Sequence, residues 1–321
     1  MGITSGRGLH VNIPLSNLAI QYKPEGLIAD QLAPIVLTSK QADAYTIYER
    51  AEAYAVEDDA RAAGAPVNRI TRSADSATFY CKNYALGSSI PQEDIENADA
   101  GWLISERQSR IESISDKLAL SWEKRVGLQM TSGTNVGSYS AVSSAWTDYT
   151  AGNSDPIGDI NTTIQGIQDL TGMRPNRMVM GDKAWRNFRE HADVIDRIYG
   201  NDGTAPGARL VTQNNAAALF ELDTVLIGGA YYNANDEGQS ASLTQIWDDN
   251  VVLYYAPNAP RKDKASAMYT FRWTPKNLPL QAQNYFSRAN YAEMIDLMMY
   301  QDEKITAPDL MWLIEAVTSA S

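Results

Sequence analysis

Cysteine and histidine are almost absent from this chain, which has only Cys81, His10 and His191 in its 321 residues. A single cysteine excludes an intrachain disulfide and agrees with a reducing compartment. The three residues lie far apart in the sequence and lack the spacing of zinc ligands, so we predict no metal site.

Long apolar runs are also missing. No stretch reaches the roughly 20 apolar residues of a membrane span. Residues 1–15 lack the basic start and the apolar run of a signal peptide. We therefore expect a soluble protein, made in the cytoplasm, that does not bind a membrane.

Positive charge is the scarcer sign, because 27 Lys and Arg residues stand against 39 Asp and Glu residues, a formal net charge of −12. A protein that binds nucleic acid tightly through its phosphates needs a clustered basic face. The densest basic run, Arg261-Lys262-Asp263-Lys264, is short and contains an acid. The sequence therefore predicts no sequence-specific binding of nucleic acid.

Motifs of common enzymes are missing as well. The chain has neither a G-x-S-x-G motif nor a G-x-x-x-x-G-K-[ST] phosphate loop, and Gly6-Arg7-Gly8 lacks the rest of a dinucleotide fingerprint. His191 is expected to be solvated at an exposed helix end, and Cys81 to be a small buried residue. We predict no catalytic, cofactor-binding or metal-binding residue, and no cofactor.

What is present indicates a folded α+β chain. Hydrophobic residues make up 44% of it and charged residues 21%, as in ordinary globular proteins. The strongest helix signal covers residues 102–130, and a second helix is expected from Pro156, capped by Asp155 and ended by Gly172. One face of the first helix is expected to carry Ile104, Ile111, Ile114, Leu118, Trp122 and Val126. Strands are expected near 177–180, 224–227, 251–255, 268–273 and 291–300, while the type of the element at 310–317 is left open.

Two segments have too little apolar content to form a core of their own. Residues 1–37 are interrupted by glycine and proline and are predicted to be an N-terminal arm. Residues 38–82 contain two expected strands, one near Tyr45–Tyr48 and one at Ala77–Tyr84, joined by a polar excursion with a breaker at Ala62–Pro66. This pattern is typical of a projecting hairpin, and both segments should lie on neighbouring molecules.

Several stretches, taken in order, resemble those of one family. They are Tyr45-Thr46-Ile47-Tyr48, Arg61-Ala62-Ala63-Gly64-Ala65-Pro66, Phe79–Leu86, Trp146-Thr147-Asp148-Tyr149, Thr171–Gly181, Ile195-Asp196-Arg197-Ile198, Ile246-Trp247, Val251–Tyr255 and Tyr269–Trp273. In order and spacing they are similar to the major capsid proteins of tailed double-stranded DNA bacteriophages. The resemblance covers most of the chain from about residue 35 to its end.

The resemblance implies the Hong Kong 97-like fold. It maps onto this chain as an N-terminal arm at 1–37, an extended loop at 38–82, and a peripheral domain at 83–149 with a spine helix at about 102–130. An axial domain at 150–265 and a return to the peripheral domain at 266–321 complete the map. Some members of the family crosslink the extended loop through a lysine, but residues 41–80 contain none, so no such crosslink is expected.

The resemblance also implies partners and a location. The subunit is expected to assemble with itself as pentamers and hexamers, in the host cytoplasm, into an icosahedral shell around packaged double-stranded DNA. A portal is expected, the short arm after Met1 implies a separate scaffolding protein, and a decoration protein is left open. Three alternatives remain: an encapsulin-type shell subunit, a decoration or tail-tube protein, and a soluble enzyme without a recognised motif.

Contacts between subunits are expected in the arm and the extended loop. Aromatic and aliphatic side chains there should be buried by neighbours, and charged ones should form ion pairs across the interface. The predicted contact residues are Leu15, Tyr22, Tyr45, Tyr48, Arg50, Tyr54, Glu57, Asp58, Asp59, Arg61 and Arg69.

Overall fold

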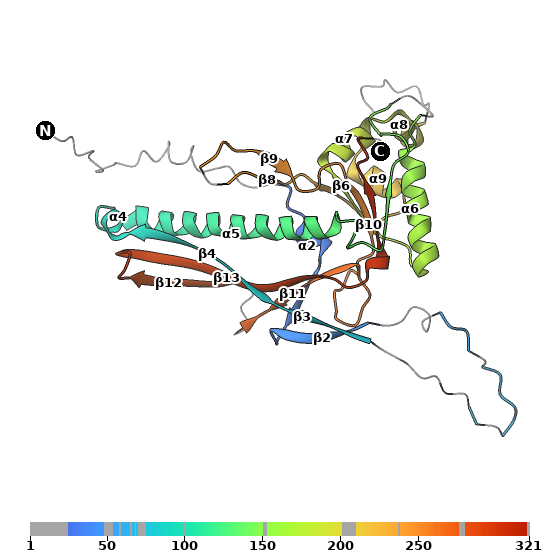
Figure 1. Cartoon of the computed structure of the whole chain (residues 1–321), viewed down its shortest axis with the longest axis horizontal. Helices are drawn as coiled ribbons and strands as arrows, with labels where there is room; N and C mark the ends of the chain where they lie inside the picture. The colour runs from blue at the N-terminus through green and yellow to red at the C-terminus, as the bar shows by residue number, and fades with distance from the viewer. Residues whose placement is uncertain are drawn as a thin grey trace.

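A computed structural model shows how the chain folds. It describes residues 25–47, 54–57, 59–64, 66–67, 69, 75–98, 100–149, 153–200, 210–236, 238–275 and 280–319. The elements form two units, each built around a five-stranded sheet, together with two smaller hairpins (Figure 1).

The first unit is a sheet centred on the long strand β13 (Ala292–Ile305). Strand β4 (Lys82–Pro91) pairs with one edge of β13. Strands β12 (Gln281–Ser287) and β11 (Met268–Trp273) pair with the other edge, at opposite ends of β13. Strand β1 (Ile35–Thr38) adds to β11 in parallel. This unit therefore joins segments from the start and the end of the chain.

Helix α5 (Ala100–Met130) lies along this sheet (Figure 1) and, at 31 residues, is about 45 Å long. Alternate residues of β13 turn toward it, and Ile295, Leu297 and Met299 pack there with Ile114 and Leu118. Burial of this apolar stripe is what holds so long a helix in place. The predicted helix is confirmed.

The predicted apolar face of α5 is right along most of the helix and wrong at its start. The stripe residues Ile114, Leu118, Trp122 and Val126 are buried, whereas Ile104 is 68% exposed and Ile111 is 38% exposed. The periodicity is continuous, but α5 packs over β13 and β4 and leaves β12 uncovered. The first two residues of the stripe are therefore less covered than the rest of it.

The second unit has the strand order β5-β14-β10-β6-β7. These strands span Ser138–Ala141, Met311–Glu315, Val251–Tyr254, Arg177–Gly181 and Thr224–Gly228. Strand β10 is buried along its whole length, as expected for a central strand. Helices α6 (Pro156–Thr171), α7 (Asp182–Glu190), α8 (Ala192–Tyr199) and α9 (Gln213–Leu219) pack around the sheet.

Helix α6 begins and ends as predicted. Asp155 accepts a hydrogen bond from the backbone N–H of Gly158, Pro156 occupies the first turn, and Gly172 ends the helix with a left-handed φ of 69°. Its apolar stripe, Ile160, Ile164 and Ile167, is buried in the second unit.

The sheets differ from the expected division of the chain at three points. Strand β14 lies in the second sheet, so of residues 266–321 only the part up to Ile305 pairs in the first sheet. Strand β5, expected in the peripheral unit, also pairs with β14. Strand β1, at the end of the predicted arm, is part of the first sheet. Each difference is a long-range pairing that local sequence patterns do not encode.

The extended segment leaves the body from a two-stranded ladder of β2 (Ala42–Ile47) and β3 (Asp75–Tyr80), as the sequence predicted. Within the segment between them, the Tyr54 ring lies against Gly172 at the end of α6, and the described residues that follow run out from the body (Figure 1). A second hairpin, β8 (Tyr231–Asn233) with β9 (Leu243–Gln245), projects above α5 in the same view.

Candidate assembly surfaces

The described residues offer little for chemistry. No group of three or more His, Cys, Asp or Glu side chains among them is placed to hold a metal ion. None of the helices they form is long and apolar enough to cross a membrane. Cys81 is buried, as predicted, and burial raises the pKa of its thiol.

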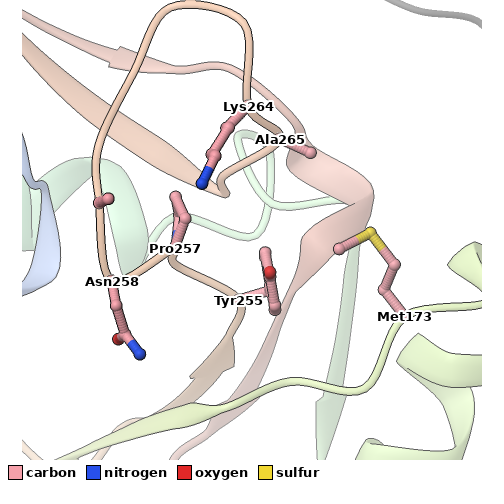
Figure 2. Close-up of a pocket in the computed structure, with 7 residues that line it drawn as sticks. Met173, Tyr255, Pro257, Asn258, Lys264 and Ala265 are labelled. Atoms are coloured by element: carbon pink, nitrogen blue, oxygen red, sulfur yellow. The ribbon is translucent and has the colours of Figure 1, made fainter.

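A hollow of about 360 Å³ lies between the end of α6 and the loop after β10. Its lining is Met173, Tyr255, Pro257, Asn258, Ala259, Lys264 and Ala265. Figure 2 shows the Lys264 amine pointing into it. The lining contains no carboxylate, imidazole or thiol that could exchange a proton with that amine. Besides Lys264, the Tyr255 phenol is the only titratable side chain in this lining.

His191 is fully buried, which corrects the expectation of a solvated helix end. Its Nδ1 accepts a hydrogen bond from the Asp193 backbone N–H, and its Nε2 lies 2.8 Å from the Ser154 hydroxyl. That hydroxyl donates to the Asp148 carbonyl oxygen. With Nδ1 used as the acceptor, the proton sits on Nε2 and is donated to Ser154.

This orientation is the reverse of an activated serine. A serine nucleophile must donate its proton to a histidine nitrogen, whereas here Ser154 accepts from His191 and donates to a backbone carbonyl. The arrangement instead fastens the junction of α7 and α8 to the segment before α6.

Glu123 joins three parts of the chain that are distant in sequence. It is fully buried on α5 and accepts hydrogen bonds from the backbone N–H groups of Ile28 and Ala29, at 2.8 and 2.7 Å. Its second oxygen accepts from Trp247 Nε1 at 2.7 Å. Burial raises the pKa of this carboxyl, although the three N–H donors act in the opposite direction. The segment that follows the N-terminal 24 residues is thereby fixed to α5 and to the second unit.

Two ion pairs fix α5 to the sheet. Arg107 binds Glu293 through two hydrogen bonds of 2.8 and 2.7 Å, which hold the pKa of the Glu293 carboxyl below its ordinary value. Further along the helix, Arg125 pairs with the buried Glu303 at 2.8 Å. The first pair is bidentate, and charge-assisted pairs of this kind set the register of helix and sheet as well as stabilising them.

The base of the extended segment is held by aromatic packing and one ion pair. Phe79 stacks on Phe271 with ring centroids 4.3 Å apart, and Tyr45 packs on the other side of the same cluster. Lys262 pairs with Asp43 at 2.9 Å, which lowers the pKa of that carboxyl. The loop after β10 therefore helps to set the direction in which the segment leaves the body.

The structure places six of the eleven predicted contact residues. Tyr45 is 7% exposed in the single chain, so a neighbour could cover little more of it. Tyr54, Glu57, Asp59, Arg61 and Arg69 are exposed. None of these last four pairs with another described residue, and their contact with a neighbour stays a prediction. Leu15, Tyr22, Tyr48, Arg50 and Asp58 lie outside the described residues.

Sequence reasoning missed an apolar surface on the first unit. Phe286 on β12 is 48% exposed and Tyr291 is 55% exposed, and Ile104 and Ile111 on α5 are exposed as well. The rings of Phe286 and Tyr291 meet edge to face with centroids 5.7 Å apart. Uncovered aromatic and aliphatic side chains that gather in this way mark sites of contact with other molecules. Tyr291, seen in the sequence as part of a strand, gave no sign of this exposure.

Comparison with known proteins gives one family. The model of the family described as phage major capsid protein E matches residues 128–297, more than half of the chain. The major capsid protein of Burkholderia phage BcepMu is 29% identical over 247 residues, which cover 76% of this chain and 75% of that protein. The major capsid protein of Pseudomonas phage JBD67 is 25% identical over 318 residues, covering 95% and 96% of the two chains.

Solved structures share the fold over nearly the whole chain. A phage-related protein from Bordetella bronchiseptica RB50 superposes with a TM-score of 0.68 and 21% identity, covering 96% of this chain and 97% of its own. The capsid of cyanophage P-SCSP1u gives a TM-score of 0.59 at 10% identity, covering 93% and 90%. At such low identity the likeness concerns the fold.

Proposed function

The chain belongs to the phage major capsid protein E family, and from this membership we propose that it is the subunit of an icosahedral virus shell that encloses double-stranded DNA. Its fold is the Hong Kong 97-like capsid fold. The observation that carries the proposal is the family match, which runs from the end of α5 into β13. The extended segment, which projects beyond the chain's own core, supports it.

The subunit assembles with itself as pentamers and hexamers. Each contact can be modest, because a closed lattice repeats it many times. Two features support self-assembly: the extended segment, which has no hydrophobic core of its own, and the exposed apolar side chains near β12. Glu57, Asp59, Arg61 and Arg69 are proposed to form ion pairs across subunits, together with Arg50 and Asp58.

The two sheets correspond to two functional units. The first, with α5, β4, β11, β12 and β13, is the peripheral domain, and the second, with β10 at its centre, is the axial domain. Glu123 and its three hydrogen bonds join them to the end of the arm. The extended loop leaves from the junction, where it can reach a neighbour.

The shell holds DNA without binding its sequence. The formal net charge of −12 opposes tight binding to phosphates, so a genome can be packaged and released. Assembly in the host cytoplasm is proposed to use a separate scaffolding protein and a portal, and a decoration protein is a further candidate partner. The subunit is proposed to catalyse no reaction. An encapsulin-type shell is not favoured, because the matched family and both relatives are phage capsid proteins.

Deletion of residues 52–66 tests the role of the extended loop. The subunit should remain soluble and folded, because the core of the loop base, Phe79 with Phe271, lies outside the deletion. It should fail to close stable shells, as measured by sedimentation and electron microscopy. A variant in which a Gly/Ser sequence of the same length replaces 52–66 separates loop length from side-chain contacts. Normal shells from the deletion would contradict the assignment of the loop.

A further inference from the structure

One aromatic side chain of the extended segment rests on the body of its own chain. Tyr54 is the only aromatic residue between positions 49 and 78. Its ring lies so close to Gly172, at the end of α6, that a Cβ on this glycine would be 2.5 Å from the ring carbon Cζ and from the hydroxyl oxygen. Carbon atoms in contact are about 3.5–4.0 Å apart, so the ring occupies the space that a side chain at position 172 would need.

This contact distinguishes Tyr54 from the residues that follow it. Tyr54 is 56% exposed, whereas Val56, two residues further along the segment, is 98% exposed. The described residues after Tyr54 run outward from the body (Figure 1). At Tyr54, therefore, the segment touches the second unit before it extends into solvent.

The end of α6 forms a well-defined seat for the ring. The N–H of Gly172 donates to the carbonyl oxygen of Gln168 at 2.7 Å. The hydroxyl of Thr171 donates to the carbonyl oxygen of Ile167 at 2.6 Å and accepts from the N–H of Met173 at 3.2 Å. Gly172 has a left-handed φ of 69°, and it has no side chain to keep the ring away. Position 172 thus combines a fixed backbone with an open face.

We propose that Tyr54 is a positioning residue, which braces the extended segment against α6 and thereby presents the outer part of the segment to a neighbouring subunit. This inference rests on the proposed function, since it supposes a neighbour. The base of the segment is fixed at β2 and β3, where Lys262 pairs with Asp43 at 2.9 Å. A second fixed point, seven residues after the end of β2 at Ile47, sets a direction that the base alone leaves free.

The brace lowers the cost of assembly. A segment that binds a neighbour loses conformational freedom, and this loss reduces the affinity. A contact that forms before binding removes part of the cost from the binding step, because fewer arrangements of the segment compete with the one that binds. Glu57, Asp59 and Arg61, which are proposed to form ion pairs across subunits, follow Tyr54 closely and benefit from its fixed position.

The opposite role, in which the contact holds the segment back from neighbours, fits the structure less well. Residues 55–57 and 59–64 are all exposed. They run outward from the body (Figure 1), so the contact at Tyr54 leaves them accessible to another subunit.

Distances between two spin labels test the brace in the unassembled subunit. Cysteines that carry the labels replace Ala62 in the segment and Gln165 on α6, which are both exposed, whereas the natural Cys81 is buried. Double electron–electron resonance should give a narrow distribution of distances. Tyr54→Ala should broaden it. Tyr54→Phe, which keeps the ring, and Val56→Ala, which shortens a side chain that is 98% exposed, should leave it narrow.

Gly172→Asn tests the seat. Asparagine tolerates a left-handed φ, so α6 can still end at this position, but its Cβ would meet the Tyr54 ring. The variant should broaden the distribution as Tyr54→Ala does. The double variant should be no broader than either single one, because both changes remove the same contact. A broad distribution in the unchanged chain, or a narrow one in either single variant, would overturn the inference.

Assembly of the same variants tests what the brace does. Light scattering over a series of subunit concentrations gives the lowest concentration at which shells form. Tyr54→Ala should raise it roughly two- to tenfold, the cost of ordering one further side chain on association, whereas Tyr54→Phe and Val56→Ala should not change it. An unchanged or lower threshold for Tyr54→Ala would contradict the brace. If the unchanged chain forms no shells at all, the proposed function is wrong, and the label distances still decide whether the brace exists.

Discussion

Replacement of Glu123 should show how strongly one buried carboxylate holds the junction of arm, helix and second sheet. Glu123→Ala leaves the N–H groups of Ile28, Ala29 and Trp247 without their acceptor in a buried site. An unsatisfied buried donor costs about 1–3 kcal/mol. Relief of the cost of burying a charge offsets part of this sum. We expect a net loss of about 3 kcal/mol in the free energy of unfolding.

Glu123→Gln is the matched control. The Gln carbonyl can still accept from Ile28 and Ala29, but its amide group would face the Trp247 N–H, so one hydrogen bond is lost. The expected loss is therefore smaller, about 1 kcal/mol. Urea denaturation of the unassembled subunit, followed by circular dichroism, measures both values.

The difference in stability between the wild type and Glu123→Gln should depend on pH in a defined direction. Burial raises the pKa of Glu123 in the folded state above the ordinary value of 4.5. The folded chain then binds this proton more tightly than the unfolded chain, so protonation favours folding. From neutral pH down toward about 4.5, the wild type should gain stability relative to Glu123→Gln. If the two proteins keep a constant difference over this range, or if Glu123→Ala is as stable as the wild type, the reasoning is refuted.

Three other substitutions have defined outcomes in the same unfolding assay. Phe79→Ala removes the ring stacked on Phe271 and should cost about 3 kcal/mol, and an unchanged stability would show that the loop base is not part of the core. Arg107→Gln should cost about 0.5 kcal/mol at neutral pH, because the arginine is 40% exposed. Because the pKa of Glu293 is lowered in the folded state, the ion pair contributes its full stability above the ordinary pKa of 4.5. The destabilisation caused by Arg107→Gln should therefore disappear as pH falls through the lowered pKa. A destabilisation that persists in acid would contradict the pairing. Gly172→Ala should cost about 1 kcal/mol because φ there is 69°, and a stabilised variant would contradict the left-handed end of α6.

Local signals predicted the helices well where capping and periodicity agree. The start and end of α6 follow from Asp155, Pro156 and Gly172, whose effects act within one turn. The apolar stripe of α5 was also visible, but periodicity does not show where the covering sheet ends. Ile104 and Ile111 belong to the stripe and are exposed, because α5 packs over β13 and β4 and not over β12.

Long-range pairing and burial of polar side chains could not be predicted in this way. His191 has charged neighbours in sequence, which indicates exposure, yet the corner between α7 and α8 turns it inward to Ser154. Glu123 lies between Trp122 and Lys124 on a helix, and nothing near it in sequence predicts N–H donors 94 and 124 residues away. For the contact sites, the loop without a core of its own was visible in the sequence, whereas the exposure of Phe286 and Tyr291 depends on how β12 and β13 pair.

The most direct test of the central claim is cryo-electron microscopy of the chain expressed with its neighbouring genes. We expect closed icosahedral shells of pentamers and hexamers in which the segment after β2 lies across an adjacent subunit. Small oligomers that never close, even when a scaffolding protein is present, would contradict it.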